Sequence, residues 1–241
     1  KANGTKRAQI YARGYKQRPG EHYHEDGISS PVVNDASIYL ILIQICLGHL
    51  YAEINDVREA FLNGTFSQGE KLYMGVLQGF ERFYPAHVLL LLLKTIYGLR
   101  QSSFEYWKKL VAVLRKQKLE RSKADPCVYF KWENKTLTLW ASWVDDLIGA
   151  GQKDNVLAGR DKIKEDFDLV EVGELTKYYG CKVDYTSDEG WMRITQPVLI
   201  QSLHDEFELP KTTYKSAGTP CLVLQKGDVK VSEEDHRMYG K

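Results

Sequence analysis

The stretch Leu139-Trp-Ala-Ser-Trp-Val-Asp-Asp-Leu-Ile-Gly-Ala150 decides how this chain folds. An apolar run rises to Val144, two acids follow at Asp145 and Asp146, and a second apolar run begins at Leu147. Two short β-prone runs around a polar break predict a β-hairpin with the acids at its tip. Adjacent carboxylates repel each other unless water or a cation screens them. The doublet is therefore either a solvated turn or part of a divalent-metal site, and a third acid elsewhere must decide.

The composition is that of a soluble globular protein, with 43% apolar and 27% charged residues in a chain of 241. The sequence contains no run of 18 apolar residues, so we expect no membrane-spanning helix and no membrane partner. The chain begins at Lys1 without a signal-peptide pattern, and we expect it to be a segment of a longer protein. The cysteines are far apart, which argues against a zinc ribbon and is compatible with a reducing interior; they are Cys46, Cys127, Cys181 and Cys221.

The charge is unevenly distributed although the net charge is only +1. Lysines and arginines gather in residues 1–21, where Glu21 is the only acid, and in residues 108–123, where Glu120 is the only acid. Such clusters can follow a phosphate backbone, or they can be ordinary solvated faces. The lysines that we take as candidate nucleic-acid contacts are Lys108, Lys109 and Lys116.

The order of predicted elements is mixed, which indicates an α+β fold. Apolar periodicity predicts helices at residues 35–49, 101–119, 154–167 and 197–207. Strands are predicted at residues 50–57, 71–74, 88–93, 127–131, 137–144, 176–185 and 191–195.

Two of these helices carry specific expectations about burial. The helix at 35–49 is apolar nearly all round, so we expect it to be a core element. The helix at 101–119 is amphipathic, and we expect its lysines to point outward. The side chains that we expect it to bury are Phe104, Trp107, Val111 and Leu114.

The third acid is Asp56, at the end of a predicted strand in the sequence Asp56-Val-Arg-Glu-Ala-Phe-Leu-Asn-Gly64. This segment closely resembles the first catalytic motif of reverse transcriptases from copia-type long-terminal-repeat retrotransposons. Trp143-Val-Asp-Asp-Leu-Ile148 resembles the second metal-binding motif of that family, which usually reads Tyr-Val-Asp-Asp. The hairpin predicted at residues 139–150 thus falls on a motif of the same family.

The resemblance covers nearly the whole chain, with further motifs in the family's order. These are Ala12-Arg-Gly-Tyr-Lys-Gln-Arg-Pro-Gly20, Ser30-Pro-Val-Val33, Tyr97-Gly-Leu-Arg-Gln-Ser102, Ser122-Lys-Ala-Asp-Pro-Cys-Val-Tyr-Phe130, Gly173-Glu-Leu175, Tyr178-Tyr-Gly180, Gln196-Pro-Val-Leu-Ile200 and Thr219-Pro220. The resemblance implies a right-hand polymerase fold with a mixed or antiparallel palm sheet packed on helices. Fingers and palm would interleave over about residues 1–170, and the palm end and the start of the thumb would occupy about residues 171–241.

The chemistry of DNA synthesis requires carboxylates from separate strands to converge, because two metal ions stabilise the attacking and the leaving oxygens. By resemblance, Asp56, Asp145 and Asp146 are the catalytic triad and hold two Mg²⁺ ions, with Mn²⁺ as the alternative. The Val57 carbonyl is implied as an additional ligand. The residues implied to contact the nucleotide are Phe61, Gly98, Arg100, Gln101 and Arg7. Of these, Phe61 would lie beneath the sugar and exclude a ribose 2′-hydroxyl.

The resemblance also implies partners and a location. The partners are an RNA or DNA template with its primer, deoxynucleoside triphosphates, and flanking integrase and RNase H regions of a polyprotein. The location is intracellular, in a cytoplasmic particle or in the nucleus.

Several positions depart from the family's pattern. Trp143 replaces the usual Tyr, Ser103-Phe104 replaces a Pro-Arg pair, and Gln9 stands where Arg is usual. These departures leave a second hypothesis open beside an RNA-directed DNA polymerase, namely a catalytically decayed or repurposed relic that binds nucleic acid or protein. An unrelated α+β metal-binding enzyme is the third.

Overall fold

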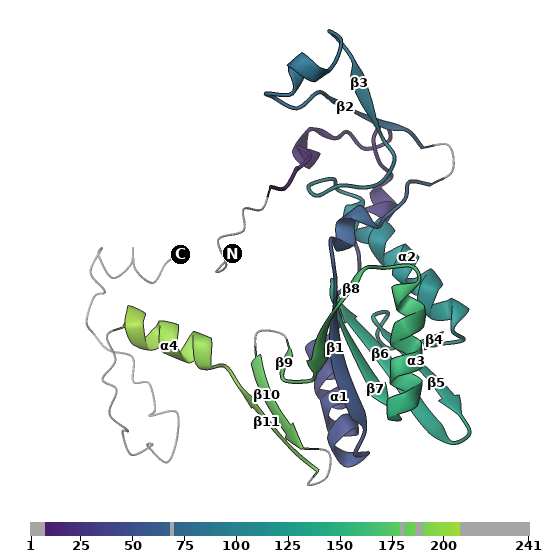
Figure 1. Ribbon diagram of the computed structural model, residues 1–241, viewed down its shortest axis with the longest axis vertical. Helices are drawn as coiled ribbons and strands as arrows, with labels where there is room; N and C mark the ends of the chain where they lie inside the picture. The colour runs from purple at the N-terminus through teal and green to yellow at the C-terminus, as the bar shows by residue number, and fades with distance from the viewer. Residues whose placement is uncertain (1–7, 68–69, 179–180, 187–189, 208–241) are drawn as a thin grey trace, which may run out of the picture. The chain divides into compact units, whose positions relative to one another are not determined.

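The computed structural model describes residues 8–67, 70–178, 181–186 and 190–207 (Figure 1). The chain divides into two compact units, Lys1–Pro197 and Val198–Lys241. Helix α4 (Pro197–Glu206) begins at their boundary and confirms the helix predicted at 197–207. None of the described helices is long and apolar enough to cross a membrane. The Thr219-Pro220 motif and Cys221 lie outside the described residues.

The first unit is built around a six-stranded sheet with the order β4-β5-β6-β7-β1-β8. Its strands are β4 (Glu120–Arg121), β5 (Val128–Glu133), β6 (Thr136–Trp143), β7 (Asp146–Gly151), β1 (Tyr51–Val57) and β8 (Leu169–Glu174). All neighbouring strands in it run antiparallel. This confirms the α+β class and the hairpin at residues 139–150, whereas the two edge strands β4 and β8 were not predicted.

Helices cover both faces of this sheet because its central strands alternate between two apolar cores. On β1, Ala52 and Ile54 belong to the core under α1 (Asp35–Leu47). Val57 belongs to the core that α2 (Ser102–Lys116) and α3 (Lys153–Lys164) share on the other face. We call these the α1 face and the α2 face.

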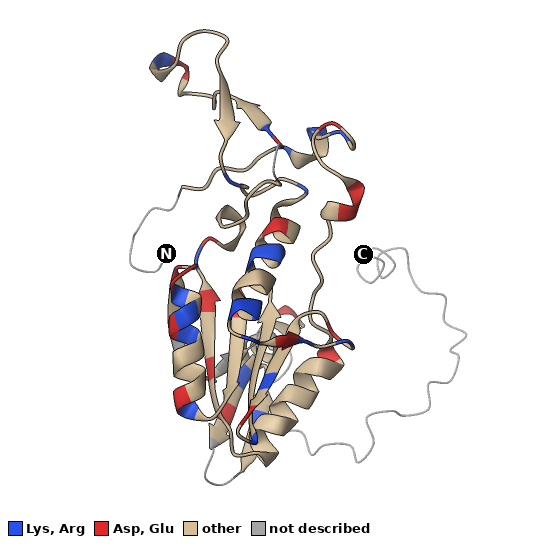
Figure 2. Ribbon diagram, turned by 90° about the vertical axis from the view of Figure 1, so that its right-hand side faces the viewer, with Lys and Arg blue, Asp and Glu red and all other residues tan. Residues whose placement is uncertain are grey.

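Helix α1 begins where the sequence indicated, since the Asn34 side chain accepts a hydrogen bond from the Ala36 amide at 2.9 Å. The expectation that this helix is a core element is confirmed for one of its sides only. Ile45 is fully buried, but Leu40 is 61% and Leu47 74% exposed. A helix that packs on one face of a sheet buries only one side, and here the outer side is apolar as well. Figure 2 shows the contrast in charge between the largely uncharged α1 and the charge-banded α2 and α3.

Helix α2 is amphipathic as predicted, but its buried side is rotated about the helix axis from the predicted position. Val111 and Leu114 are buried as expected, and Lys108 and Lys116 point outward. Phe104 and Trp107 are only half-buried, and Tyr106 occupies the centre of the buried side instead. The buried stripe is therefore rotated toward the side of Tyr106, Leu110 and Val113.

Helix α3 approaches the sheet closely through Trp140 on β6, which is 1% exposed. Trp140 pairs with Gly149 on β7, and a Cβ on Gly149 would lie 2.8 Å from its ring. A Cβ on Gly159 of α3 would lie 3.3 Å from the same ring. Glycines on both sides thus leave space for the indole between strand and helix.

Smaller elements complete the first unit. A hairpin pairs β2 (Leu72–Gly75) with β3 (Leu89–Leu92). A second sheet has the order β11-β10-β9 and contains β9 (Lys177–Tyr178), β10 (Cys181–Thr186) and β11 (Trp191–Thr195). Single 3₁₀ turns lie at η1 (Gly14–Lys16), η2 (Glu25–Gly27), η3 (Ala60–Leu62) and η4 (Glu81–Phe83).

Candidate active site

Asp56 and Asp146 lie directly opposite each other in the ladder between β1 and β7. Residues in such a pair point to the same face of a sheet, with their Cβ atoms about 4.5–5.5 Å apart. Both continue the alternation of Ile54 and Ile148, so they belong to the α1 face. They stand at the end of one strand and the start of the other.

Asp145 lies in the turn between β6 and β7, which the backbone makes with a positive φ of 53° at Val144. The Asp145 carbonyl accepts a hydrogen bond of 2.8 Å from the Val57 amide. This bond ties the turn to the end of β1, next to Asp56. The first two motifs of the sequence are thereby joined at one point of the sheet.

The electrostatics of this point favour a cation. Burial raises the pKa of Asp146 to about 6, and the negative charges of Asp145 and Asp56 contribute to this rise from its ordinary value. Holding these carboxylates ionised together is costly, because like charges in a partly desolvated site repel. A bound cation would relieve this repulsion.

The donor chemistry fits a hard divalent ion, since carboxylate oxygens are what such ions take. Among the described residues, no group of three or more His, Cys, Asp or Glu side chains forms a ready-made metal cluster. Mg²⁺ in phosphate-handling sites is typically held by one or two carboxylates, waters and substrate phosphates instead of an all-protein cage. The carboxylates here match a site of that type, in which water and substrate phosphates supply the remaining metal ligands.

Strand β1 is held by a buried polar network on the α2 face. Glu53 is 2% exposed and accepts hydrogen bonds from Asn55 at 3.0 Å and from Tyr51 at 3.1 Å. Arg160 of α3 forms an ion pair with it at 3.3 Å. Because these partners hold the buried charge from both the strand and the helix, the network anchors β1 and therefore Asp56.

Phe61 lies in the 3₁₀ turn η3 that follows β1, after Glu59 in a left-handed conformation with a φ of 51°. Its ring is half-buried and makes edge contacts with Tyr97 at 5.5 Å and Tyr106 at 6.4 Å. The Thr95 hydroxyl donates to the Phe61 carbonyl at 2.6 Å. The ring is thus fixed against the α2 core on the chain segment that leaves Asp56.

Gly98 supports a close contact between two chain segments. Its φ is +85°, and a Cβ there would lie 2.2 Å from the Ala12 carbonyl oxygen. The Ala12 amide donates to the Tyr97 carbonyl at 2.7 Å. Only glycine permits this conformation with so close a neighbour.

The side chains of Arg100 and Gln101 are bonded within the protein. Arg100 is exposed and donates to the Gly14 carbonyl at 3.1 Å. Gln101 is 3% exposed, donates to the His22 carbonyl at 3.0 Å and accepts from Gln17 at 3.0 Å. Both fasten residues 14–22 to the start of α2. Arg7, the remaining predicted nucleotide contact, lies outside the described residues.

The three candidate nucleic-acid lysines are also engaged within the protein. Lys108 pairs with Glu105 at 3.0 Å. Lys109 donates to the Asp166 carbonyl at 3.0 Å, and Lys116 pairs with the Asp166 carboxylate at 3.3 Å. Their contacts link α2 to itself and to the end of α3.

Sequence reasoning missed Tyr106, a buried residue of α2 that lies within electrostatic range of Asp145. Its side chain is 2% exposed, and among the described residues its hydroxyl has no hydrogen-bond partner. Burial raises its pKa far above the ordinary value, and the charge of Asp145 contributes next. The phase of α2 could have revealed it, because Tyr106 lies one turn before the buried Leu110.

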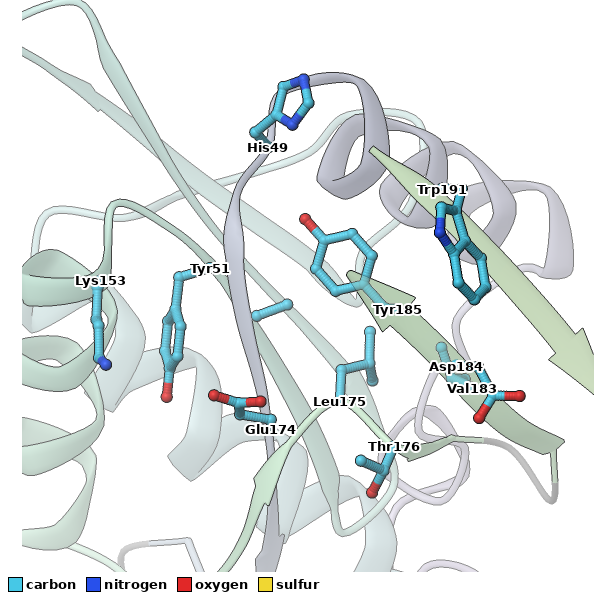
Figure 3. Close-up of a pocket in the computed structure, with 11 residues that line it drawn as sticks. His49, Tyr51, Lys153, Glu174, Leu175, Thr176, Val183, Asp184, Tyr185 and Trp191 are labelled. Carbon is cyan, nitrogen blue, oxygen red and sulfur yellow. The ribbon is translucent and has the colours of Figure 1, made fainter. Parts of the chain in front are cut away.

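A separate cavity of about 720 Å³ lies at the other end of β1 (Figure 3), lined among others by Tyr51, Glu174 and Tyr185. The Lys153 ammonium lies 5.3 Å from the centre of the Tyr51 ring. Tyr51 is about 17 Å along the strand from Asp56. This cavity is therefore distinct from the carboxylate site.

An antiparallel sheet with carboxylates at the meeting point of two strands, backed by helices, defines the molecule as an α+β protein with a candidate cation site. The family model described as "Reverse transcriptase (RNA-dependent DNA polymerase)" matches residues 1–222, and the chain belongs to this family. It is a reverse transcriptase domain of the copia type. Reverse transcriptases generally use divalent metal ions.

Curated relatives agree with this assignment. The chain is 28% identical over 232 residues to the "Retrovirus-related Pol polyprotein from transposon TNT 1-94" of Nicotiana tabacum, covering 95% of this chain and 17% of the relative. It is 28% identical to the Pol polyprotein from transposon RE1 of Arabidopsis thaliana, covering 73% of this chain and 12% of the relative. It is 23% identical to the Transposon Ty1-MR1 Gag-Pol polyprotein of Saccharomyces cerevisiae, covering 99% of this chain and 14% of the relative. The chain thus spans less than a fifth of each, and no solved structure matches it.

Proposed function

We propose that this domain catalyses RNA-directed DNA synthesis within a retrotransposon polyprotein. Deoxynucleoside triphosphates would be added to a primer on an RNA or DNA template, and integrase and RNase H regions would flank the domain. The observation that carries the proposal is the pairing of Asp56 with Asp146, with Asp145 bonded beside them. Membership of the reverse transcriptase family supports it.

The proposed arrangement is a right-hand polymerase. The six-stranded sheet with α1, α2 and α3 would be the palm. The β2–β3 hairpin and residues 8–34 would be the fingers, and the start of the thumb would follow β11. The contacts of Gly98 and Gln101 with residues 12–22 support a fixed joint between fingers and palm.

In the proposed chemistry, Asp56, Asp145 and Asp146 hold two Mg²⁺ ions, or Mn²⁺, and the Val57 carbonyl is an additional ligand. Bound there, the ions would stabilise the attacking and the leaving oxygens of the phosphoryl transfer. The part of the carboxylates is to converge from β1 and the β6–β7 turn and to supply the negative charge. The part of β1, anchored by Glu53 and Arg160, is to keep that geometry fixed.

Phe61 is proposed to lie beneath the sugar of the incoming nucleotide and to exclude a ribose. Its ring contacts with Tyr97 and Tyr106 support the rigidity that such selection needs. Gly98 would permit close approach to the base pair. Arg100, the exposed member of the turn, and Arg7 would meet the nucleotide or template, whereas Gln101 would act through the segment that it fastens.

The second candidate is a catalytically decayed copy that still binds nucleic acid. The observation that favours it is the internal bonding of Arg100 and Gln101, two polar residues of the predicted nucleotide turn. Binding of a primer–template without extension is the result that would support this candidate.

Primer extension on an RNA template, with Mg²⁺ and labelled deoxynucleotides, tests the proposal. We expect the chain to extend the primer and Asp56→Asn or Asp145→Asn to lower the rate at least about 1,000-fold, equivalent to about 4 kcal/mol of transition-state stabilisation. Asp154→Asn, which replaces an exposed acid in the first turn of α3, is the matched control and should keep the parental rate. No extension by a folded chain, or equal rates in all variants, would reject the polymerase proposal.

A further inference from the structure

A basic pocket lies at the end of α2, away from the carboxylates. It has a volume of about 510 Å³ and connects the last turn of α2 with β4. Its lining residues are Arg115, Leu119, Glu120, Arg121, Ser122, Lys123 and Pro126. Three cations and one carboxylate give this lining a positive net charge.

The cations of this pocket are available, in contrast to those of the preceding turns. Among the described residues, no carboxylate pairs with Arg115, Arg121 or Lys123. Arg121 lies 5.5 Å from the centre of the Trp107 ring, a contact that orients a guanidinium without neutralising it. Lys108 and Lys116, by comparison, are paired with Glu105 and Asp166.

Ser122 adds a polar donor to the same pocket. Its Oγ accepts hydrogen bonds from the Ala124 amide at 3.2 Å and the Asp125 amide at 3.4 Å. These bonds use its lone pairs and fix its position, so its O–H remains to donate. A fixed hydroxyl beside two guanidinium groups and an ammonium is a suitable surrounding for phosphate oxygens.

The pocket is separate from the carboxylate site. In the ladder between β4 and β5, Arg121 lies opposite Tyr129, whose buried side chain belongs to the α2 face. Asp146 belongs to the α1 face. Arg121, Tyr129, Trp140 and Gly149 form one row across the strands. Three strand spacings and three residues along β7 put Arg121 about 17 Å from Asp146 through the sheet.

We propose that this pocket binds a backbone phosphate of a nucleic-acid strand outside the polymerase cleft. An arginine guanidinium can donate two parallel hydrogen bonds to two phosphate oxygens. The lysine ammonium adds positive charge and requires no particular orientation. The pocket offers no apolar or aromatic surface for a base beyond Leu119 and Pro126, so we expect contacts to the backbone without sequence preference. The site does not depend on catalysis, and binding should persist when Asp145 is replaced by Asn.

Two triple variants with the same loss of charge test the proposal. The pocket variant is Arg115→Gln, Arg121→Gln and Lys123→Gln, and the control replaces three ion-paired cations elsewhere, as Lys131→Gln, Lys182→Gln and Arg193→Gln. Fluorescence anisotropy with a labelled single-stranded RNA, in the Asp145→Asn background, reports affinity over a salt series. We expect the pocket variant to lose about 10-fold in affinity near 0.1 M salt and to reduce the slope of log K against log salt by about 2. The control should lose less than about 3-fold.

Further experiments distinguish phosphate binding from misfolding and from binding of an acidic protein. The double variant Arg115→Gln and Lys123→Gln keeps the contact of Arg121 with Trp107, and an unchanged circular dichroism spectrum will show that a loss of binding does not reflect misfolding. Inorganic phosphate should compete with RNA at millimolar concentration in the parent and not in the pocket variant. Equal losses in both triple variants, or no loss in the pocket variant, would overturn the proposal. Binding of a poly-glutamate peptide in preference to RNA would also overturn it and would assign the pocket to an acidic protein partner.

Discussion

Helices α1 and α2 pack on opposite faces of one sheet and differ in the polarity of their outer, solvent-facing sides. Each has a fully buried residue in its last turn, Ile45 in α1 and Leu114 in α2. The outer side of α2 is charged, while α1 has no charged residue after Asp35 and exposes Leu40 and Leu47. Burial alone thus explains both inner sides, but only α2 has the outer side that water favours.

The first test of this comparison is to truncate the fully buried side chain of each helix. We expect Ile45→Ala and Leu114→Ala to lower the free energy of unfolding by about 3 kcal/mol each, within the range of about 2–5 for such cavities. Urea unfolding followed by circular dichroism measures both. A loss below about 1 kcal/mol in Ile45→Ala alone would mean that the α1 face carries little of the stability.

The second prediction tests whether Phe61, which packs on the α2-face core, also selects the sugar of the nucleotide in the proposed active site. We expect Phe61→Val to open space beneath the sugar and raise ribonucleotide use relative to deoxynucleotide use by about 100-fold, equivalent to about 2.7 kcal/mol. Deoxynucleotide use should fall only modestly. Steady-state kinetics with paired nucleotides give the ratio, with Phe83→Val of η4 as the control aromatic.

An unchanged nucleotide preference in the Phe61→Val protein would identify Phe61 as a packing residue of the α2 core. The contacts of its ring with Tyr97 and Tyr106 would then serve stability alone. In that case Phe61 would not contribute to nucleotide selection at the proposed active site.

The third prediction concerns Tyr106, whose buried hydroxyl has no partner among the described residues. A buried polar group without a hydrogen bond is costly, so we expect Tyr106→Phe to raise the free energy of unfolding by about 1 kcal/mol. Thermal unfolding in the absence of metal measures the change. Destabilisation by the same amount would reveal a hydrogen bond that the hydroxyl makes in solution.

The smallest effect is expected on the outer side of α1. Leu40→Gln should change the free energy of unfolding by less than about 0.5 kcal/mol, because an exposed side chain loses few contacts. Lys116→Gln on the outer side of α2 is the matched variant and should behave alike. A loss above about 1.5 kcal/mol in Leu40→Gln at concentrations that permit association would contradict an exposed outer side in solution.

Local sequence patterns determined most of the elements and the identity of the three acids. The Asp-Asp doublet between two apolar runs predicted the β6–β7 hairpin, and the periodicity of residues 101–119 predicted α2. These features depend on neighbours within a few residues, and such neighbours are fixed by the order of the chain. The motif around Asp56 pointed to the family for the same reason.

Only the tertiary structure decided which residues meet. The pairing of β8 with β1, the register that sets Asp56 opposite Asp146, and the burial of Tyr106 in the α2-face core depend on contacts between distant segments. The same holds for charge: Arg115 and Lys116 are neighbours in the sequence, but Asp166 from a distant segment pairs with Lys116, whereas no described carboxylate pairs with Arg115. Residue type and spacing determine what a side chain offers, whereas long-range packing determines what it faces, because the partner is chosen by the fold and not by the neighbouring sequence.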